Sequence, residues 1–284
     1  MAVSADDPAT RVLSFLSALE PAGGVVAISG GVDSALTLSL AAQAWGAGRT
    51  LAATSRSASL PPAELQAAAA QATVLGVEHV VLEGAELDIE AFRSNGRDRC
   101  FHCKDHLYGR LQRLAQARGL VHVLDGTNAD DMGDHRPGMQ AARLHGVVSP
   151  LLEAGLTKQD VRTLSQARGL TAWDKPAEAC LSSRFPYGTE VTEAGLGRVE
   201  RAERALKAFG FPVVRVRVHD PVARIEVPAE DIARLMSAPL RGQVEAAVRA
   251  AGFSFVTVDL QGFRSGRLND EPDANAAQET PHSS

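Results

Sequence analysis

The stretch that decides the fold is Ile28-Ser29-Gly30-Gly31-Val32-Asp33-Ser34, which stands between an apolar run and a segment with helical spacing. Two adjacent glycines permit tight or left-handed backbone angles and let a ligand approach the main chain closely. Several backbone N–H groups then point to one place at the N-terminus of the following helix, where an anion is favoured. We therefore predict a phosphate-binding site here. A glycine turn that serves only packing is the alternative.

This loop differs from the Walker loop, because it contains no Gly-Lys-Ser/Thr. A pyrophosphate held without that lysine suggests cleavage between the α- and β-phosphates of a nucleotide rather than transfer of the γ-phosphate. The hydroxyls of Ser29 and Ser34 add donors to the main-chain N–H groups. The candidate phosphate-binding residues are Ser29, Gly30, Gly31, Val32, Asp33 and Ser34.

Outward from the loop, apolar runs alternate with helical patterns. The runs at 24–30, 50–55, 79–84 and 121–126 predict strands, and the segments 33–45, 61–76 and 104–118 predict helices. This alternation predicts an α/β fold in which helices cover both faces of a parallel sheet. Ligands of such sheets bind beyond the carboxyl ends of the strands. Further candidates at those ends are Ser55, Gly126, Thr127 and Asp131.

The segment DGTNADD, residues 125–131, is rich in carboxylates. Hard carboxylate oxygens suit Mg²⁺, which favours a nucleotide-binding loop. The other interpretation is a solvated turn held by Asx-type hydrogen bonds. Because the segment follows a strand of the same predicted sheet, the functional interpretation is favoured.

The second half of the chain has a different order of elements. A helix over 194–209, strands over 213–219 and 222–227, helices over 229–237 and 240–251 and a strand over 254–259 predict a small α+β unit. We therefore expect a first domain at 1–188 and a second domain at 189–268. The tail at 269–284 has no large apolar residue and is predicted to be disordered.

Composition excludes some function classes. The 284 residues carry a formal net charge of -5, which gives no general attraction to nucleic acid. No apolar run is long enough to cross a bilayer, and the N-terminus does not resemble a secretory signal. We therefore expect a cytoplasmic protein with neither a membrane nor a nucleic acid as its partner.

The chain has three cysteines, namely Cys100 and Cys103 in a CxxC pair and Cys180 in a long loop. An odd number argues against a disulfide framework. The thiols are interpreted as small buried apolar groups, as a zinc site with His106, as a redox pair, or as ligands of an iron–sulfur cluster with one open iron. Spacing alone does not choose among these readings.

Longer motifs resemble a known family. SGGVDS resembles the PP-loop of ATP pyrophosphatases. Behind it, RCFHCKDHLY (99–108), EACLSSRFPYGTEVT (178–192), VVRVRVHDPVARIEV (213–227) and VTVDLQGFRSGRLN (256–269) resemble the LarE family. That family comprises the ATP-dependent sulfur transferases of nickel-pincer cofactor synthesis, which serves lactate racemase. The resemblance implies a PP-loop domain of the adenine nucleotide alpha hydrolase-like type with a C-terminal α+β domain.

The resemblance also implies a reaction. ATP, with Mg²⁺, adenylates a carboxylate of pyridinium-3,5-biscarboxylic acid mononucleotide, and sulfur then displaces AMP to leave a thiocarboxylate. In one branch of the family a single cysteine, matching Cys180, gives up its sulfur. In another branch three cysteines, matching Cys100, Cys103 and Cys180, hold a [4Fe-4S] cluster that uses sulfide from a separate donor. The presence of all three favours the cluster.

Residue by residue, the resemblance implies that Asp33 helps to place Mg²⁺ or pyrophosphate. It implies binding of substrate or phosphate by Ser183, Arg184, Arg215, Arg217, Glu203 and Glu226. A homo-oligomer built through the C-terminal domain is expected, with a hexamer as its specific form. The alternatives are a tRNA thiolase, an amidating enzyme similar to NAD or GMP synthetase, and a nucleotide-binding module without turnover.

Overall fold

The computed structural model of the chain describes residues 7–19, 21, 23–133, 137–264 and 266. The predicted disordered tail at 269–284 lies outside these residues. The chain divides into two compact units, one of Met1–Glu86 with Cys100–Glu178 and the other of Leu87–Arg99 with Ala179–Ser284. We call them the first unit and the second unit. Each unit is described by itself.

The first unit is built on a parallel sheet, as predicted. In the described part of the chain this sheet has four strands in the order β3-β2-β1-β4. The strands are β1 (Gly24–Ala27), β2 (Thr50–Arg56), β3 (Glu78–Glu83) and β4 (His122–Leu124). Val25 of β1 is in register with Leu51 of β2 on one side and with Val123 of β4 on the other. The central position of β1 places the glycine loop at the middle of the sheet edge.

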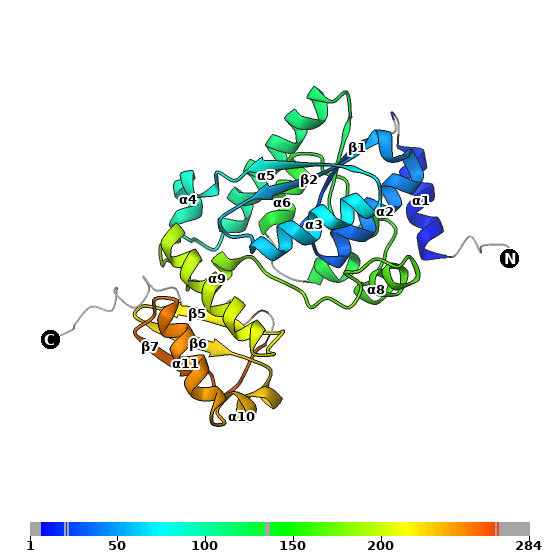
Figure 1. The fold of residues 1–284 in the computed structure, drawn as a ribbon. Helices are drawn as coiled ribbons and strands as arrows, with labels where there is room; N and C mark the ends of the chain where they lie inside the picture. The colour runs from blue at the N-terminus through cyan, green and yellow to red at the C-terminus, as the bar shows by residue number, and fades with distance from the viewer. Residues whose placement is uncertain (1–6, 20, 22, 134–136, 265, 267–284) are drawn as a thin grey trace. The chain divides into compact units, whose positions relative to one another are not determined.

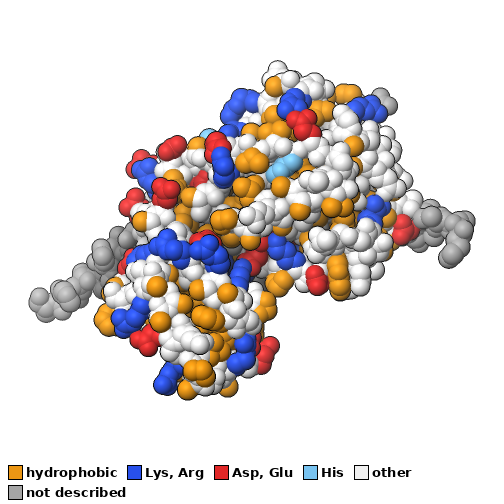
Figure 2. Space-filling model, viewed as in Figure 1, with side chains coloured by type: hydrophobic (Ala, Val, Ile, Leu, Met, Phe, Trp, Pro, Cys, Tyr) orange, Lys and Arg blue, Asp and Glu red, His pale blue; other side chains and the backbone are white. Residues whose placement is uncertain are grey.

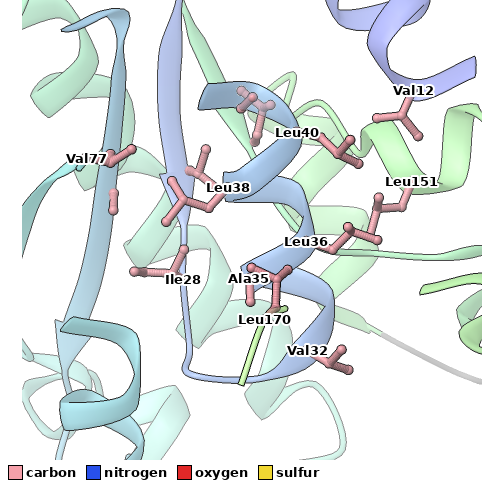
Figure 3. Close-up of a cluster of buried hydrophobic side chains, with 14 of the residues drawn as sticks. Val12, Ile28, Val32, Ala35, Leu36, Leu38, Leu40, Val77, Leu151 and Leu170 are labelled. Atoms are coloured by element: carbon pink, nitrogen blue, oxygen red, sulfur yellow. The ribbon is translucent and has the colours of Figure 1, made fainter. Parts of the chain in front are cut away.

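Helices cover both faces of this sheet (Figure 1). They are α1 (Pro8–Ala18), α2 (Val32–Trp45), α3 (Pro62–Val74), α5 (Arg99–Ala117), α6 (Pro137–Leu144), α7 (Pro150–Glu153) and α8 (Lys158–Ala167), with 3₁₀ turns η1 (Ala47–Arg49), η2 (Glu86–Asp88) and η3 (Ala129–Gly133). One apolar cluster (Figure 3) contains side chains from the helices α1, α2, α3, α7 and α8, and a second cluster contains side chains from α5 and α6. Alternation along β1 sends Val26 into the first cluster and Val25 into the second.

Helix α2 is the buried helix of the unit. Leu36, Leu38 and Leu40 are inaccessible to solvent although they do not share one face. A helix that is apolar all round is stable only where other elements surround it. The helix therefore has its N-terminus, and the glycine loop before it, held firmly by packing.

The second unit has a smaller sheet. Within the described ranges it contains three strands in the order β5-β6-β7. These strands are β5 (Arg215–His219), β6 (Val222–Glu226), which is antiparallel to β5, and β7 (Phe255–Val258), which is parallel to β6. The helices are α4 (Glu90–Arg93), α9 (Glu193–Ala208), α10 (Ile232–Leu235) and α11 (Leu240–Ala250), with 3₁₀ turns η4 (Leu181–Arg184) and η5 (Ala229–Asp231).

The segment Leu87–Arg99 joins the second unit through Asn95. Its side-chain amide donates to the carbonyls of Phe185 at 3.3 Å and Pro186 at 2.7 Å. Its own carbonyl accepts from the N–H of Gly188 at 3.0 Å. Asn95 is fully buried, so these bonds satisfy polar groups that water does not reach.

The predicted α/β fold with a parallel sheet is confirmed. The helix expected at 229–237 is the 3₁₀ turn η5 followed by the short helix α10, and the largest shift of a helix start is that of α5. The helix expected at 104–118 begins at Arg99, so the CxxC pair is helical. Helices α1, α4, α6 and α7 were not predicted. No helix of the described residues combines the length and the apolar character that crossing a membrane requires. Basic and acidic side chains are interspersed on the face shown in Figure 2.

Candidate functional site

The glycine loop connects β1 to α2 and has the backbone that the sequence predicts. Gly30 adopts a φ of +81°, in the region that favours glycine. A Cβ atom there would lie 2.5 Å from the main-chain oxygen of Glu64. Gly31 is the N-cap residue and has no side chain to accept from the N–H groups of the first helical turn. Those N–H groups and the helix dipole favour an anion at this point.

The two serines of the loop fasten it internally. Ser34 Oγ accepts from the N–H of Ser29 at 3.2 Å and donates to the carbonyl of Gly31 at 3.2 Å. The side chain of Val32 is buried in the core, so this residue can contact a ligand only through its main-chain atoms. The loop is thus shaped before any ligand binds.

The loop that follows β4 lies directly against the N-terminus of α2. A Cβ atom on Gly126 would be 2.7 Å from the nitrogen of Ser34. Asn128 Nδ2 donates to Asp33 Oδ1 at 3.0 Å. Two loops that are far apart in sequence therefore meet at the edge of the sheet, as the strand pattern predicts.

The carboxylates of this second loop are engaged in local hydrogen bonds. Buried Asp125 accepts from Tyr108 at 2.9 Å, from Ser149 at 2.7 Å and from the hydroxyl of Thr127 at 3.0 Å. Asp131 Oδ2 accepts from the N–H of Asn128 at 3.0 Å. This arrangement matches the Asx-turn interpretation, with the loop placed beside the glycine loop as the functional interpretation requires.

Ser55 is the second-last residue of β2, at the carboxyl end of that strand. In the described part of the chain, no group of three or more His, Cys, Asp and Glu side chains is placed to hold a metal ion.

Two lysines that the sequence pattern did not identify contact the glycine loop. Lys158 Nζ is paired with Asp33 Oδ2. Lys175 Nζ lies 2.7 Å from Glu64 Oε2 and 3.2 Å from the carbonyl oxygen of Gly30. The sequence does indicate that Lys158 is the first residue of a helix, because it directly follows Thr157, the N-cap residue of α8. No local pattern marks Lys175.

The CxxC pair lies in the first two turns of α5. Cys100 is exposed and Cys103 is half-buried, and residues three apart on a helix share a face. The next residue, Lys104, has its ammonium 3.3 Å from the hydroxyl of Tyr108. The negative charges that Tyr108, Asp125 and Cys103 can carry raise the pKa of Lys104. Burial raises the pKa of Tyr108 to about 12.

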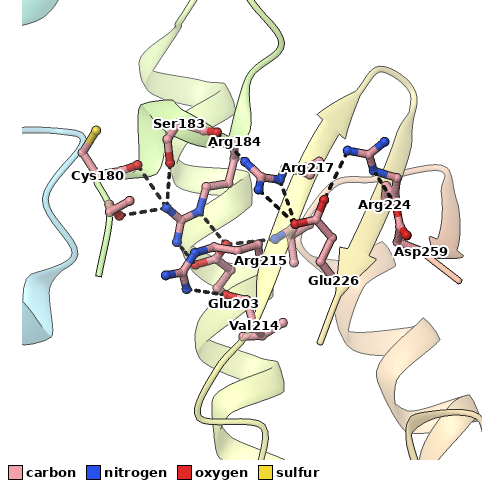
Figure 4. A network of polar contacts seen from close by, with 12 residues as sticks. Cys180, Ser183, Arg184, Glu203, Val214, Arg215, Arg217, Arg224, Glu226 and Asp259 are labelled. Carbon is pink, nitrogen blue, oxygen red and sulfur yellow. Dashed lines mark hydrogen bonds and ion pairs between the residues drawn. The ribbon is translucent and has the colours of Figure 1, made fainter. Parts of the chain in front are cut away.

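In the second unit, Arg184 is the centre of a polar network around Cys180 (Figure 4). Its guanidinium is inaccessible to solvent and makes two 2.8 Å bonds to the carboxylate of Glu203. It also donates to the carbonyls of Ala179 and Cys180 and to the hydroxyl of Ser183. Arg184 therefore fixes the backbone on which Cys180 is carried.

The network continues through Ser183 to the strands. The carbonyl of Ser183 accepts from Arg217 at 2.7 Å, and Arg217 is paired with Glu226 at 2.9 Å. Arg215 is on the same face of β5, with its guanidinium 5.0 Å from the centre of the Phe263 ring. The structure thus places together the six residues Ser183, Arg184, Glu203, Arg215, Arg217 and Glu226.

Arg99 is a further member of this site that the sequence analysis missed. It is buried and donates to the carbonyl of Ser182 at 2.9 Å. Cys180 is exposed. Desolvation by the neighbouring protein would raise the pKa of its thiol, but the charges of Arg99 and Arg184 and the hydrogen bonds with Ser182 and Ser183 outweigh this effect and lower the pKa. A lowered pKa favours the thiolate, which is the form that acts as nucleophile or metal ligand.

Comparisons with other proteins give close relatives, although no family model matches the sequence. The chain is 44% identical to an uncharacterized protein of Synechocystis sp., over 86% of this chain and 91% of the relative. It is 39% identical to pyridinium-3,5-bisthiocarboxylic acid mononucleotide synthase of Lactiplantibacillus plantarum, over 92% of this chain and 95% of the relative. An uncharacterized protein of Methanocaldococcus jannaschii is 27% identical over 63% of this chain and 69% of its own length.

Proposed function

The chain belongs to the LarE family of enzymes, and from that membership we propose that it is an ATP-dependent sulfur transferase of nickel-pincer cofactor synthesis. Its substrate in this proposal is pyridinium-3,5-biscarboxylic acid mononucleotide. ATP adenylates one carboxylate of that substrate, and sulfur then displaces AMP to form the thiocarboxylate. The observation that carries the proposal is the glycine loop with its left-handed Gly30 and its uncapped helix N-terminus.

The chemistry explains why both ATP and a sulfur nucleophile are needed. A carboxylate reacts poorly with nucleophiles because its oxygen is a bad leaving group. Adenylation converts that oxygen into part of AMP, which leaves readily. A thiolate or hydrosulfide is a strong nucleophile near neutral pH and attacks the activated carbon. Pyrophosphate leaves in the first step and AMP leaves in the second.

We assign the nucleotide to the first unit. The main-chain N–H groups of the glycine loop bind its phosphates, and the loop after β4 closes one side. The residues in this assignment are Ser29, Gly30, Gly31, Val32, Asp33, Ser34, Ser55, Gly126, Thr127 and Asp131. Asp33 is the proposed Mg²⁺ ligand, since Mg²⁺ typically takes one or two carboxylates together with substrate phosphates and water.

We assign the mononucleotide's phosphate to the second unit. Arg215 and Arg217 present guanidinium groups from one face of β5, and guanidinium binds phosphate with two parallel hydrogen bonds. Glu226 is paired with Arg217, while Glu203 and Ser183 hold Arg184. The acidic partners orient the arginines before substrate arrives.

For the sulfur, we propose that Cys100, Cys103 and Cys180 are the ligands of a [4Fe-4S] cluster. An all-thiolate donor set suits iron–sulfur centres or zinc. The adjacent turn positions of Cys100 and Cys103 and the lowered pKa of Cys180 fit metal-binding thiolates. Held by these three thiolates, a cluster would supply one iron without a protein ligand, at which sulfide from a separate donor could be taken up. Direct loss of the Cys180 sulfur is the variant mechanism.

The test is anaerobic purification with analysis of iron and sulfide, followed by assay with ATP, sulfide and the biscarboxylic mononucleotide. We expect pyrophosphate and AMP to form only with that substrate, and many thiocarboxylates per protein. Cys100→Ser and Cys180→Ser should then lose iron and turnover together. Zinc in place of iron would contradict the cluster, as would turnover that ends after one event with the mass of H₂S lost from Cys180.

The oligomeric form is part of the same proposal. We expect a homo-oligomer, specifically a hexamer, assembled through the second unit. Light scattering on the full chain measures its mass directly, and a monomer at working concentration would contradict this assignment.

A further inference from the structure

We propose that Lys175 is a phosphate-binding residue of the ATP site and that Glu64 holds its ammonium beside the glycine loop until the nucleotide arrives. This inference rests on the proposed function. The glycine loop itself contains no lysine or arginine, and in this proposal Lys175, which is distant in sequence, supplies the positive charge.

The position of the ammonium is the first observation. Lys175 Nζ is 2.7 Å from Glu64 Oε2 and 3.2 Å from the carbonyl oxygen of Gly30. Gly30 is the residue whose left-handed backbone shapes the loop. The cation therefore sits against the same loop whose N–H groups are aimed at the phosphates.

The donor inventory of the ammonium is the second observation. A lysine ammonium has three N–H donors. Glu64 and Gly30 accept two of them, and among the described residues nothing accepts the third. The Lys175 side chain is 26% exposed, so this donor remains accessible to a ligand. A phosphate oxygen can take it without breaking the pair with Glu64.

The backbone that carries Lys175 is fixed, which is the third observation. Arg162 of α8 donates to the carbonyls of Trp173 at 2.9 Å and Lys175 at 3.0 Å. The N–H of Lys175 donates to the carbonyl of Ala172 at 3.2 Å. Only the flexible side chain has to adjust when a phosphate binds, so little backbone entropy is lost.

Charge decides which partner the ammonium prefers. An ion pair between partly exposed side chains contributes little free energy. A polyphosphate carries several negative charges and is held by main-chain donors at the same place, so its attraction for Lys175 exceeds that of the single Glu64 carboxylate. Glu64 thus positions Lys175 and at the same time competes weakly with the ligand.

The two roles make opposite predictions for two variants of the full chain. Calorimetric titration with inorganic pyrophosphate and with ATP should show binding weakened about tenfold or more in Lys175→Met, which loses a charge-assisted hydrogen bond. Glu64→Gln removes the competing charge and should tighten pyrophosphate binding several-fold. Lys175→Arg keeps the charge and should retain most of the affinity.

Two controls separate this effect from a general loss of charge or of fold. Lys207→Met makes the same charge change on α9 of the second unit and should leave the affinity for pyrophosphate unchanged. AMP, which has no β- or γ-phosphate, should bind to Lys175→Met as it binds to the unsubstituted chain. Circular dichroism confirms that each variant is folded.

Failure of this inference is distinguishable from failure of the proposed function. If the unsubstituted chain binds ATP and pyrophosphate but Lys175→Met binds them equally well, the inference is overturned and the proposed function stands. If Lys175→Met and Glu64→Gln both weaken binding to the same degree and both melt earlier, the pair is structural and the inference is again overturned. If the unsubstituted chain binds neither ligand, the proposed function fails with it.

Discussion

Arg184 shows at the scale of one residue how the second unit holds its candidate site. The guanidinium is inaccessible to solvent and paired bidentately with Glu203. Burial of two charges is costly, and mutual attraction offsets that cost only where geometry and additional hydrogen bonds are good. The carbonyls of Ala179 and Cys180 supply those bonds. Removing one partner alone should therefore do more harm than removing both.

We expect Arg184→Met to lower the free energy of unfolding by about 3–5 kcal/mol, because the buried carboxylate of Glu203 is left without its partner. The double variant Arg184→Met with Glu203→Met should recover a large part of that loss. Urea denaturation followed by circular dichroism measures both. Equal losses in the single and double variants would show that the pair is not what stabilises this region.

The glycines of the loop offer a second comparison between neighbouring residues. Gly30→Ala should destabilise the chain by about 1–3 kcal/mol, because alanine resists the left-handed backbone and its Cβ would meet the Glu64 carbonyl. Gly31 has a φ of -84°, and a Cβ atom there would have its nearest neighbour, Ser29 Oγ, at 3.5 Å. Gly31→Ala should therefore lower the free energy of unfolding by less than about 1 kcal/mol. Thermal unfolding ranks the two, and the reverse order would contradict the assigned loop geometry.

At the scale of the element, α5 and α8 each bring several groups to one place. Helix α8 supplies Lys158 in its first turn and Arg162 one turn later, and a capping box of Thr157 and Asp160 fixes where the helix begins. Helix α5 carries the CxxC pair, Lys104 and Tyr108, which follow one another on neighbouring turns of the helix. The start of each helix therefore decides whether its functional groups reach their partners.

Tyr108 gives α5 a measurable dependence on pH. Its pKa of about 12 in the folded chain is above the ordinary value of about 10, so the fold holds this proton more tightly than the unfolded chain does. The stabilisation is complete below about pH 10 and is lost as the pH rises toward about 12, by roughly 2 kcal/mol. Tyr108→Phe should reduce this alkaline loss. If both proteins lose stability equally between these pH values, Tyr108 is not the titrating group.

The sequence predicted the elements whose signals are local. The four strands stand out as apolar runs, and the glycine loop marks where β1 ends and α2 begins. The start of α5 at Arg99 was missed because the stretch from Arg99 to His102 has no regular apolar spacing. Packing against the rest of the chain, which a local pattern does not contain, decides that boundary.

The candidate site divides in the same way. Motif spacing identified the glycine loop, the three cysteines and the alternating Arg215 and Arg217. Lys175 and Arg99 were missed because their partners, Glu64 and Ser182, are 111 and 83 residues away in sequence. Such pairs form only when the fold brings them together.

At the scale of the whole molecule, the two units contain different spectroscopic probes. The chain has two tryptophans, Trp45 and Trp173, and both lie in the first unit. Trp45 is buried, and its indole N–H donates to the carbonyl of Leu16 at 3.0 Å. Tryptophan fluorescence therefore follows unfolding of the first unit, while circular dichroism follows both units.

We expect Glu226→Gln to separate these two signals. The variant leaves Arg217 and Arg224 without the buried carboxylate that pairs with them, and the damage is confined to the second unit. The transition seen by circular dichroism should begin at lower urea, while the tryptophan transition stays in place. Saturating ATP should then shift only the tryptophan transition. Coincident shifts of both signals would show that the units unfold as one.

The passage of Leu87–Arg99 into the second unit has a practical consequence for dissecting the gene. A fragment that stops at residue 178 keeps Asn95 but discards Phe185 and Pro186, which accept its amide protons. In such a fragment Leu87–Arg99 would expose side chains that are buried in the full chain, and it would become prone to aggregation or proteolysis. Isolating the first unit by itself thus requires replacing the thirteen residues Leu87–Arg99 with a short turn, rather than trimming the chain from either end.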